Sequence, residues 1–515
     1  MIWHIFKKDA KLLWWLAAIV AVLRFAELAV VQISGLFPTQ RGRNLMMLLA
    51  LGGLLGVGFA ICAVVHQDAI PGVRQDWLVR PIRRRDLLAS KLLFVVAMIQ
   101  FPIFLGDLIQ ALLTGTSPVA SITSALSRSI FLLLLVDIPL LAFASVTRNF
   151  LEAVTGGVAI FGIFGTCAML FLGDPGRRFQ PTFGTGVEWV TVSSLALTLS
   201  IGSAALLGLQ YFQRRTLLAS CVTGAVTLLG ILATFVPWTP AFAIQKTLSP
   251  SPNSAAGVNI SFQPSLGRYR RGADFPVLRA GDVQAWVFLP IDFSGLPDDS
   301  GVQVDRPSVS VIGPGGGSIA QLVASRISVR RNPGDNPTQS GYQMLAVPGD
   351  LYRQIKNQSV RLEIDYSLTL FKSAFSHSLP AVNANVHVPG AGWCATRVNP
   401  AETAVQLSCE QGGRPPDCLS INLEHLSSGR KTPDRLNCEQ ADYGPFPSWQ
   451  LLPDGLAHFG GALAFRDPNG FATFPVIGSM LPESELVMHV YRAAEHFTRK
   501  VVIPEVRLGD WEAGI

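Results

Sequence analysis

The sequence predicts an α-helical polytopic membrane domain of about seven spans at residues 1–240, followed by a mainly β, sandwich-like soluble domain at 241–515. Three observations predict this arrangement. The chain has 515 residues, of which 49% are hydrophobic and only 15% are charged, and this balance suits a membrane protein. Long apolar runs stop near residue 240, and Gly, Pro, Ser and Asn are spread through the remainder. Four cysteines cluster within that remainder.

Seven apolar runs are long enough to cross a bilayer, which takes about 20 residues. They lie near 12–33, 45–66, 92–114, 129–147, 152–172, 189–211 and 216–237. The segment before the first run, residues 1–11, alternates apolar and polar residues and is expected to lie in the membrane interface as a short amphipathic helix. Pro102 and Pro139 are expected to kink the third and fourth spans.

Basic residues in the loops set the orientation, because Lys and Arg accumulate on the cytoplasmic side. With the N-terminus inside, the inner segments carry twelve: Lys7, Lys8, Lys11, Arg74, Arg80, Arg83, Arg84, Arg85, Lys91, Arg148, Arg214 and Arg215. The outer loops before the last span carry five: Arg41, Arg43, Arg128, Arg177 and Arg178. This bias predicts a multi-pass protein of the inner (plasma) membrane with a cytoplasmic N-terminus and an extracytoplasmic C-terminal domain. It also accounts for the net charge of +6, so nucleic-acid binding is not expected.

The clustered cysteines are Cys394, Cys409, Cys418 and Cys438. An even number of cysteines in a domain outside the cytoplasm predicts two disulfides. A structural zinc site is the alternative, although the cluster has no C-x-x-C pair. Of the three possible pairings, Cys394 with Cys409 and Cys418 with Cys438 is favoured, because sequential pairs close short loops.

Alternation of apolar and polar residues predicts the strands of the second domain. Residues 360–370 and 382–388 alternate over their whole length. A short helix is expected at 349–356, and many short strands with turn residues between them favour sandwich-type packing. Shorter strand signals lie at 258–262, 283–289, 307–312, 326–330, 404–409 and 499–507.

The second domain shows no pattern typical of an enzyme. The glycine-rich run 313–317 lacks the Lys-Ser/Thr pair of a phosphate-binding loop. Its histidines show no metal-binding spacing, so each is expected to be a surface or hydrogen-bonded histidine. We therefore expect no catalytic activity and no cofactor in this chain.

Four ionisable residues lie inside the predicted spans, where charge is costly. Arg24 and Glu27 are three residues apart in the first span, so they share a helix face and are expected to pair. Asp107 lies in the third span and Asp137 in the fourth. These side chains either line a polar translocation path or hold the helices together, and the sequence leaves both possibilities open.

The cytoplasmic loop between the second and third spans, residues 67–91, is longer than topology requires. Its second half has helical composition, and a proline suits the start of such a helix. A basic helix at this place either docks on a soluble partner or contacts anionic lipid, and composition supports the two equally. The residues expected to dock are Arg80, Pro81, Arg83, Arg84, Arg85, Leu87, Leu88 and Lys91.

Residues 76–93, DWLVRPIRRRDLLASKLL, resemble the corresponding loop of ABC-2-type transporter permeases. In that family a leucine-rich stretch leads to Pro-(Ile/Leu)-x-Arg and then to Lys-Leu-Leu at the third span. The basic start of the chain is similar to the family's N-terminal interfacial helix, and the resemblance covers roughly residues 1–237. It implies that the loop contacts a separate ATP-binding subunit and that a homo- or hetero-dimer of permeases forms the path. Family members commonly have six spans, so a seventh span and an outer domain depart from the pattern.

Three functions follow as hypotheses. The first is the non-catalytic membrane subunit of an ABC-type export system, whose ATPase is a partner because the chain has no Walker A motif. The alternative is a membrane-anchored binding or sensory protein, whose outer β domain recognises a ligand or envelope partner. A secondary transporter that couples protons through Asp107 and Asp137 is a third possibility.

Overall fold

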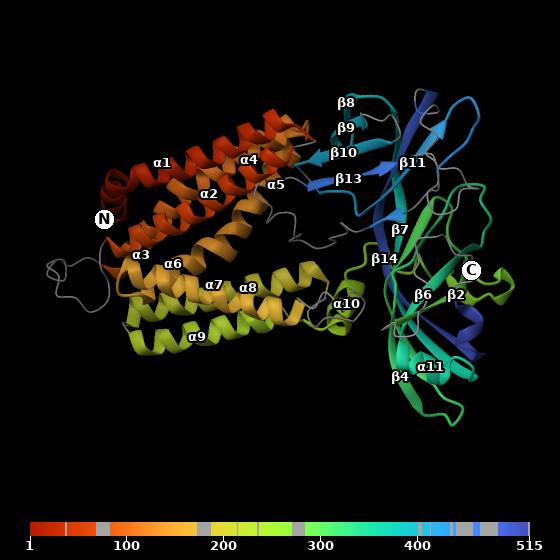
Figure 1. Ribbon diagram of the computed structural model, residues 1–515. Coiled ribbons are helices and arrows are strands. Elements are labelled where there is room, and N and C mark those ends of the chain that lie inside the picture. Colours follow the sequence, from red (N-terminus) through yellow and green to blue (C-terminus); the bar gives the residue numbers. More distant parts are fainter. Residues whose placement is uncertain are drawn as a thin grey trace.

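The computed structural model describes residues 1–36, 39–67, 83–172, 187–213, 215–233, 236–269, 284–399, 404–412, 414–432, 436–438, 457–463, 481 and 483–512. Helices form its N-terminal part and strands most of its C-terminal part (Figure 1). The described helices are α1 (Ile2–Ser34), α2 (Gln40–His66), α3 (Arg84–Phe94), α4 (Phe101–Leu113), α5 (Pro118–Leu132), α6 (Ile138–Val146), α7 (Phe150–Leu172), α8 (Glu188–Gly208), α9 (Thr216–Ala233), α10 (Trp238–Thr247) and α11 (Gly349–Ile355).

Three π-helical segments extend these helices. Val95–Gln100 joins α3 to α4, Leu133–Asp137 joins α5 to α6, and Leu209–Gln213 follows α8. Consequently α3 and α4 form one pass of 30 residues, and α5 and α6 form another of 29. Helix α1 begins at Ile2 and continues without a break, so the separate interfacial helix predicted at residues 1–11 is wrong.

Within the described residues, five helical passes are long and apolar enough to cross a membrane: Ile2–Ser34, Gln40–His66, Arg84–Leu113, Pro118–Val146 and Trp189–Gln213. A sixth is counted if Leu217–Ala233 and Trp238–Thr247, which are bent by 77°, form one span. In α7 the apolar stretch Phe150–Ile160 is shorter than these passes. The apolar helices are typical of a multi-pass membrane protein, whereas the predicted total of seven spans is not confirmed.

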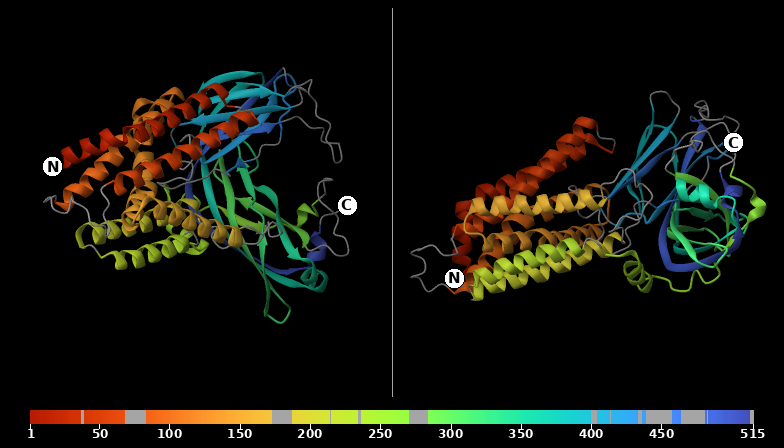
Figure 2. Two further views of the ribbon diagram at one scale, coloured as in Figure 1. Left: turned by 60° about the vertical axis from the view of Figure 1, so that its left-hand side comes forward. Right: turned by 60° about the horizontal axis from the view of Figure 1, so that its bottom comes forward.

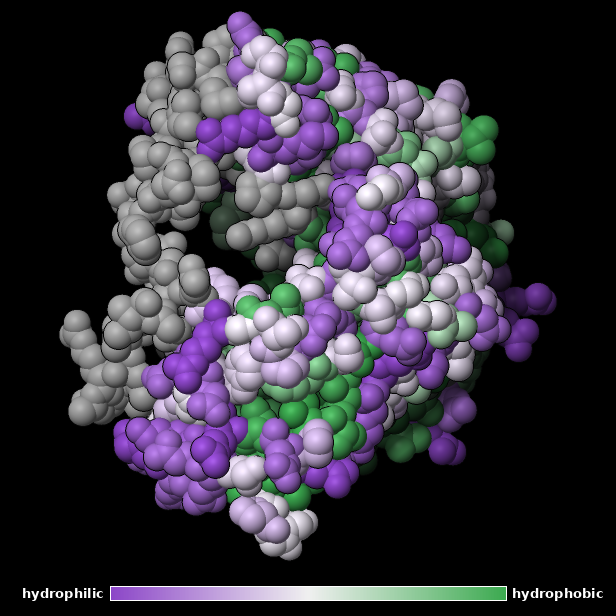
Figure 3. Space-filling model, turned by 90° about the vertical axis from the view of Figure 1, so that its right-hand side faces the viewer, coloured by the Kyte–Doolittle hydropathy of each residue, from purple (hydrophilic) through white to green (hydrophobic). Residues whose placement is uncertain are grey.

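The surface of the molecule divides in the same way as the fold. Only six of the large, exposed hydrophobic side chains in the described residues lie after residue 250. Figure 3 shows the face of the β region that points away from the helices, where hydrophilic residues surround a smaller hydrophobic area. Most exposed apolar surface therefore belongs to the helices, as lipid contact requires.

The N-terminus lies at the end of the helical bundle farthest from the strands, and the views in Figures 1 and 2 agree on this point. At the opposite end, the turn between α4 and α5 contacts the β region, as does α10. The helices run between these two ends. The N-terminal end and the β region thus lie on opposite sides of the apolar bundle.

The strands form two antiparallel sheets. The larger has the order β1-β2-β6-β4-β3-β7-β14-β11-β12, with β5 paired to β3, and the smaller has the order β13-β10-β9-β8. The strands are β1 (Asn259–Phe262), β2 (Gln284–Ser294), β3 (Ser300–Ile312), β4 (Ser318–Ala324), β5 (Ser328–Arg331), β6 (Gln339–Pro348), β7 (Val360–Pro380), β8 (Ala384–Val388), β9 (Gly392–Val398), β10 (Val405–Gln411), β11 (Cys418–His425), β12 (Leu436–Asn437), β13 (Ala457–Leu463) and β14 (Ser484–Val506).

Strands β7 and β14 pair along most of their length and contribute residues to two large hydrophobic cores. In the first half of β7 the alternating residues Val360, Leu362 and Ile364 are buried in one core, as their period-2 pattern predicts. In its second half Leu379 belongs to the other core, which packs beneath the small sheet. The mainly β character is confirmed, and the described strands enclose two large cores and a smaller one around Phe371 and Tyr491.

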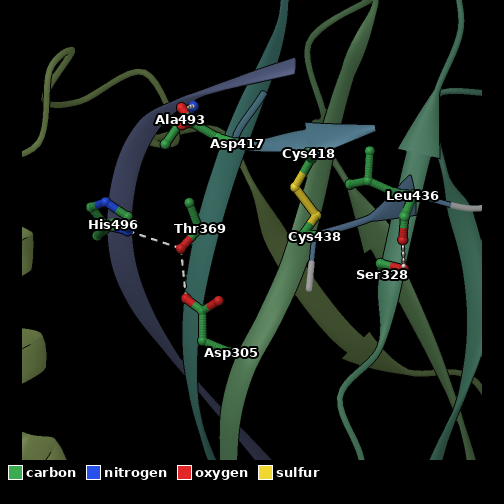
Figure 4. Close-up of a disulfide and its surroundings, with 9 residues drawn as sticks. All are labelled: Asp305, Ser328, Thr369, Asp417, Cys418, Leu436, Cys438, Ala493 and His496. Atoms are coloured by element: carbon green, nitrogen blue, oxygen red, sulfur yellow. Dashed lines mark hydrogen bonds between the residues drawn. A yellow bond between two sulfur atoms is a disulfide. The ribbon is translucent and has the colours of Figure 1, made fainter. Parts of the chain in front are cut away.

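Both disulfides link sequential cysteines. Cys394 and Cys409 are direct register partners of β9 and β10, with their Cα atoms 4.0 Å apart. Cys418 of β11 bonds Cys438, with a Cα separation of 4.2 Å (Figure 4). This is the pairing that closure of short loops favours.

Candidate functional site

Charged side chains of α1 and α4 meet inside the helical bundle. The guanidinium of Arg24 donates to Glu27 over 3.0 Å, so the pair predicted from their spacing is present. Its other nitrogen, Nη2, donates to the Asp107 carboxylate over 2.6 Å and to the Gln110 amide oxygen over 2.8 Å. All four residues are buried, and pairing of this kind is what keeps charge tolerable in an apolar medium.

Arg128 of α5 joins the same cluster. It donates to the Asp107 oxygen that also accepts from Arg24, so this carboxylate lies between two guanidinium groups. Arg128 was predicted to lie in an outer loop, and that assignment is wrong because α5 already begins at Pro118. Gly106 lets Arg24 approach α4 closely, since a methyl group there would lie 3.1 Å from the Arg24 Cγ atom.

A second polar pair lies nearby, where the Gln100 amide donates to the Asp137 carboxylate. Each residue is the last of a π-helical segment, and each lies within two residues of a proline, Pro102 or Pro139. A proline removes one backbone N–H from the helix, and a π-helical turn is one way to accommodate this loss. Such turns are frequent at functional sites. The two predicted proline sites therefore coincide with altered helix geometry beside a buried carboxylate.

The two polar groups share a cavity of about 350 Å³. Arg24, Glu27 and Arg128 line it, together with Gln100 and Asp137. Apolar side chains, most of them from α2, form the rest of the lining. Of the intramembrane residues predicted to be functional, Arg24, Glu27 and Asp137 contact the cavity directly, and Asp107 holds its two arginines.

The start of α3 presents a basic surface at the N-terminal end of the bundle. Arg83, Arg84 and Arg85 are exposed. Arg84 donates to the backbone oxygen of Phe212 over 3.3 Å, and Arg85 lies over the ring of the same residue. The remaining predicted docking residues before this helix lie outside the described residues: Arg80 and Pro81.

Other residues predicted for the docking surface are turned into the bundle. Leu87 is only 5% exposed and packs in the helical core, while Leu88 is half-buried against it. Lys91 is fully buried and donates to Asp9 of α1 over 2.8 Å. The expectation that Leu87 and Lys91 face a partner is corrected, because Leu87 packs in the helical core and Lys91 pairs with α1.

The β region contacts the helical bundle at the α4–α5 turn. The indole N–H of Trp393 in β9 donates to the backbone oxygen of Leu113, the last residue of α4, over 2.9 Å. His387 of β8 lies over Gly115, whose φ is +72°, and a methyl group there would lie 2.5 Å from the imidazole. Glycine is required at this turn for both reasons.

Helix α10 makes the second contact. Its Trp238 donates to Ser367 of β7 over 3.2 Å, and Phe242 packs edge-on against His496 of β14. Gln245 lies 3.0 Å from the His496 ring nitrogen. Helix α10 was not predicted, because it begins just after the last apolar run, which was predicted to end near residue 237.

His496 continues into a polar chain inside the β region, which Figure 4 shows. Its Nδ1 atom lies 2.8 Å from the Thr369 hydroxyl, which donates to Asp305 over 2.6 Å. Burial lowers the pKa of His496 to about 4 and raises the pKa of Asp305 to about 7. His496 is thus a hydrogen-bonded histidine, as expected, and this chain joins three strands beside α10.

Three residues of the membrane site were missed by sequence analysis: Gln100, Gln110 and Arg128. The first two are neutral and stand alone in apolar runs, and they take part only through contacts between helices, Gln100 with Asp137 and Gln110 with Arg24. A scan of protein-family models finds no match to the chain, and a search of curated proteins finds no significant match.

Proposed function

We propose that this chain is the non-catalytic membrane subunit of an ABC-2-like export system that works with a separate ATP-binding subunit. The observation that carries the proposal is the cavity, which is lined by Arg24, Arg128 and Asp137 within apolar helices. Charged side chains are costly in a bilayer and are typical of substrate or ion pathways. A role confined to anchoring the β region would not require them.

The two ends of the bundle are proposed to face different compartments. We propose that the N-terminal end is cytoplasmic, in line with the bias of basic residues, and that the β region is extracytoplasmic. Arg83, Arg84 and Arg85 then face the cytoplasm, at the place where the resemblance to ABC-2 permeases implies contact with the ATPase. Disulfides in the β region suit an oxidising compartment. A second permease copy would complete the path.

Capture of the ATPase tests this proposal. The full chain, isolated from its native membrane in mild detergent, should retain an ATP-binding subunit that mass spectrometry identifies by its Walker A sequence. Replacing Arg83, Arg84 and Arg85 together by Glu should abolish its capture, because the contact surface changes sign. Arg148→Glu is the matched control, since Arg148 is exposed at the same end of the bundle. Equal capture by both variants would exclude this docking surface.

A membrane-anchored sensory protein is the second candidate, and the contact between Trp393 and Leu113 favours it. A ligand that moved the β region would pull on α4, which carries Asp107 and Gln110 a short distance before this contact. The two candidates differ in their partner. A sensor would co-purify with a signalling protein or with none, whereas an export permease would co-purify with an ATPase.

A further inference from the structure

The cavity in the bundle has one apolar wall that is well suited to hydrocarbon. Met47, Leu51 and Leu54 of α2 line it, as does Val57, and their spacing places them on one face of the helix. The first three remain 73%, 51% and 48% exposed. This wall is therefore open on the flank of the bundle, so a ligand with an apolar body can enter from the lipid.

The charged residues in the cavity lining, counted together with the adjacent Asp107, carry one negative charge in excess. Arg24 and Arg128 contribute two positive charges, and both donate to Asp107. Asp107 and Glu27, which pairs with Arg24, contribute two negative charges that balance the arginines. Asp137 is then a third carboxylate, and the bond that it makes within the described residues is to the neutral amide of Gln100. A buried carboxylate of this kind calls for a positive charge or a proton.

Gln100 supplies an independent indication that a positively charged group is accommodated here. The residue is 6% exposed, lines the cavity and uses its amide nitrogen to bind Asp137. Its amide oxygen, Oε1, is buried and has no hydrogen-bond partner in the described part of the chain. Buried acceptors are rarely left unsatisfied in proteins. The Asp137 carboxylate and this negatively polarised oxygen together favour a positive charge at the cavity wall.

We propose that the cavity binds a lipophilic organic monocation, with its positive charge beside Asp137 and Gln100 and its apolar body along Met47, Leu51 and Leu54. A volume of about 350 Å³ lies within the range of small-molecule sites, about 300–1,000 Å³. A lipophilic anion fits poorly, because both arginines already bind carboxylates and Asp137 would repel it. As a statement about what is exported, this inference rests on the proposed function, although binding itself does not.

Tetraphenylphosphonium is a suitable probe, because tetraphenylborate has nearly the same shape and the opposite charge. Binding of each to the full chain is measured by equilibrium dialysis in phosphatidylcholine nanodiscs, with empty nanodiscs subtracted. The phosphonium should bind saturably, and the borate should not. Saturable binding of both ions, or of neither, would overturn the proposal. If Asp137 binds only a proton, neither ion should bind.

Two variants locate the bound cation. Asp137→Asn keeps the shape of the side chain and removes its charge, so it should weaken phosphonium binding roughly tenfold or more. Glu152→Gln, which changes an exposed carboxylate in the first turn of α7 that does not line the cavity, should leave binding unchanged. If Asp137→Asn fails to fold, Leu51→Trp fills the apolar wall without altering charge and should also weaken binding. Unchanged affinity in a folded cavity variant would overturn the proposal.

The outcome is separable from that of the proposed function. A chain that captures an ATP-binding subunit but does not bind the phosphonium would overturn only the ligand class. A chain that binds the phosphonium but captures no ATPase would retain the binding site and exclude the ABC-type mechanism.

Discussion

Trp393 of β9 donates its indole N–H to the backbone oxygen of Leu113 at the end of α4, and this bond joins the β region to the pass that carries the polar cluster. Asp107 and Gln110 lie on α4 within two turns of Leu113. The contact is independent of the covalent link through α10, so the β region is attached to the bundle at two separated points. Movement of the β region would consequently act on α4 as well as on the last helix.

Trp393→Phe should loosen the α4–α5 turn, because it removes the N–H and retains most of the ring. One neutral hydrogen bond contributes about 0.5–1.5 kcal/mol, so amide exchange around Gly115 should accelerate by roughly 2- to 12-fold. Hydrogen-exchange mass spectrometry of the full chain measures this. Trp511→Phe, in the packing of the β region against Phe262, is the control and should not affect the turn. An equal effect of both variants would argue against the contact.

Lys91→Met should strongly destabilise the helical bundle. The substitution leaves Asp9 buried without the lysine that lies 2.8 Å away, and breaking a buried ion pair costs about 3–5 kcal/mol. Thermal unfolding in detergent should show a much lower midpoint. Lys11→Met, which changes an exposed lysine of the same helix as Asp9, should have little effect. Combining Lys91→Met with Asp9→Asn should recover part of the loss, and no recovery would mean that the pair is not the cause.

The polar chain of the β region predicts opposing pH dependences. Burial lowers the pKa of His496 to about 4, so between about pH 6.5 and 4 the unfolded state binds a proton that the folded state does not. Stability from this group is lost as pH falls. Burial raises the pKa of Asp305 to about 7, so the folded state holds a proton that the unfolded state releases. Stability from that group is lost as pH rises from about 4 to 7.

Single variants separate these two contributions. Asp305→Asn should make the free energy of unfolding rise more steeply with pH between 4 and 6.5 than it does in the unaltered chain, by up to about 1.4 kcal/mol per pH unit. His496→Gln should change the slope in the opposite direction. Thermal unfolding of the full chain across this pH range measures both. Changes of the same sign in the two variants would contradict the assigned protonation states.

The disulfides and the topology are tested together. Replacing Cys418 and Cys438 by Ser should cost about 2–4 kcal/mol of stability in the β region. Peptide mapping without reduction should show the two sequential linkages, and four free thiols would contradict them.

A reporter that is active only in the cytoplasm should be silent when fused after Ile515. An active reporter would place the β region inside and reverse the proposed orientation.

The sequence predicted what depends on local pattern. Apolar runs located the membrane helices, and period-2 alternation at 360–370 located the first half of β7. Arg128 was placed in a loop because polar residues after Pro118 lower the apolar character of the first turns of α5. Burial of Leu87 and Lys91 could not be foreseen, since it depends on packing between α3 and α1.

Long-range pairing explains the other differences. The two cores along β7 and β14 arise from strand register between residues more than 100 positions apart, which no local pattern encodes. The Gln100–Asp137 bond also requires two helices to meet at their π-helical segments. The candidate site was thus foreseen as a set of four ionisable residues, and its neutral members and its cavity came only from the arrangement of the helices.

ATP hydrolysis by the purified complex tests the central claim most directly. The chain has no Walker A motif, so any hydrolysis must come from a captured subunit. We expect vanadate-sensitive hydrolysis from the full chain and its partner in lipid nanodiscs, with loss of that activity when Arg83, Arg84 and Arg85 are replaced by Glu. A well-folded chain that purifies from its native membrane with neither an ATP-binding subunit nor ATP hydrolysis would contradict the assignment as an ABC-type permease.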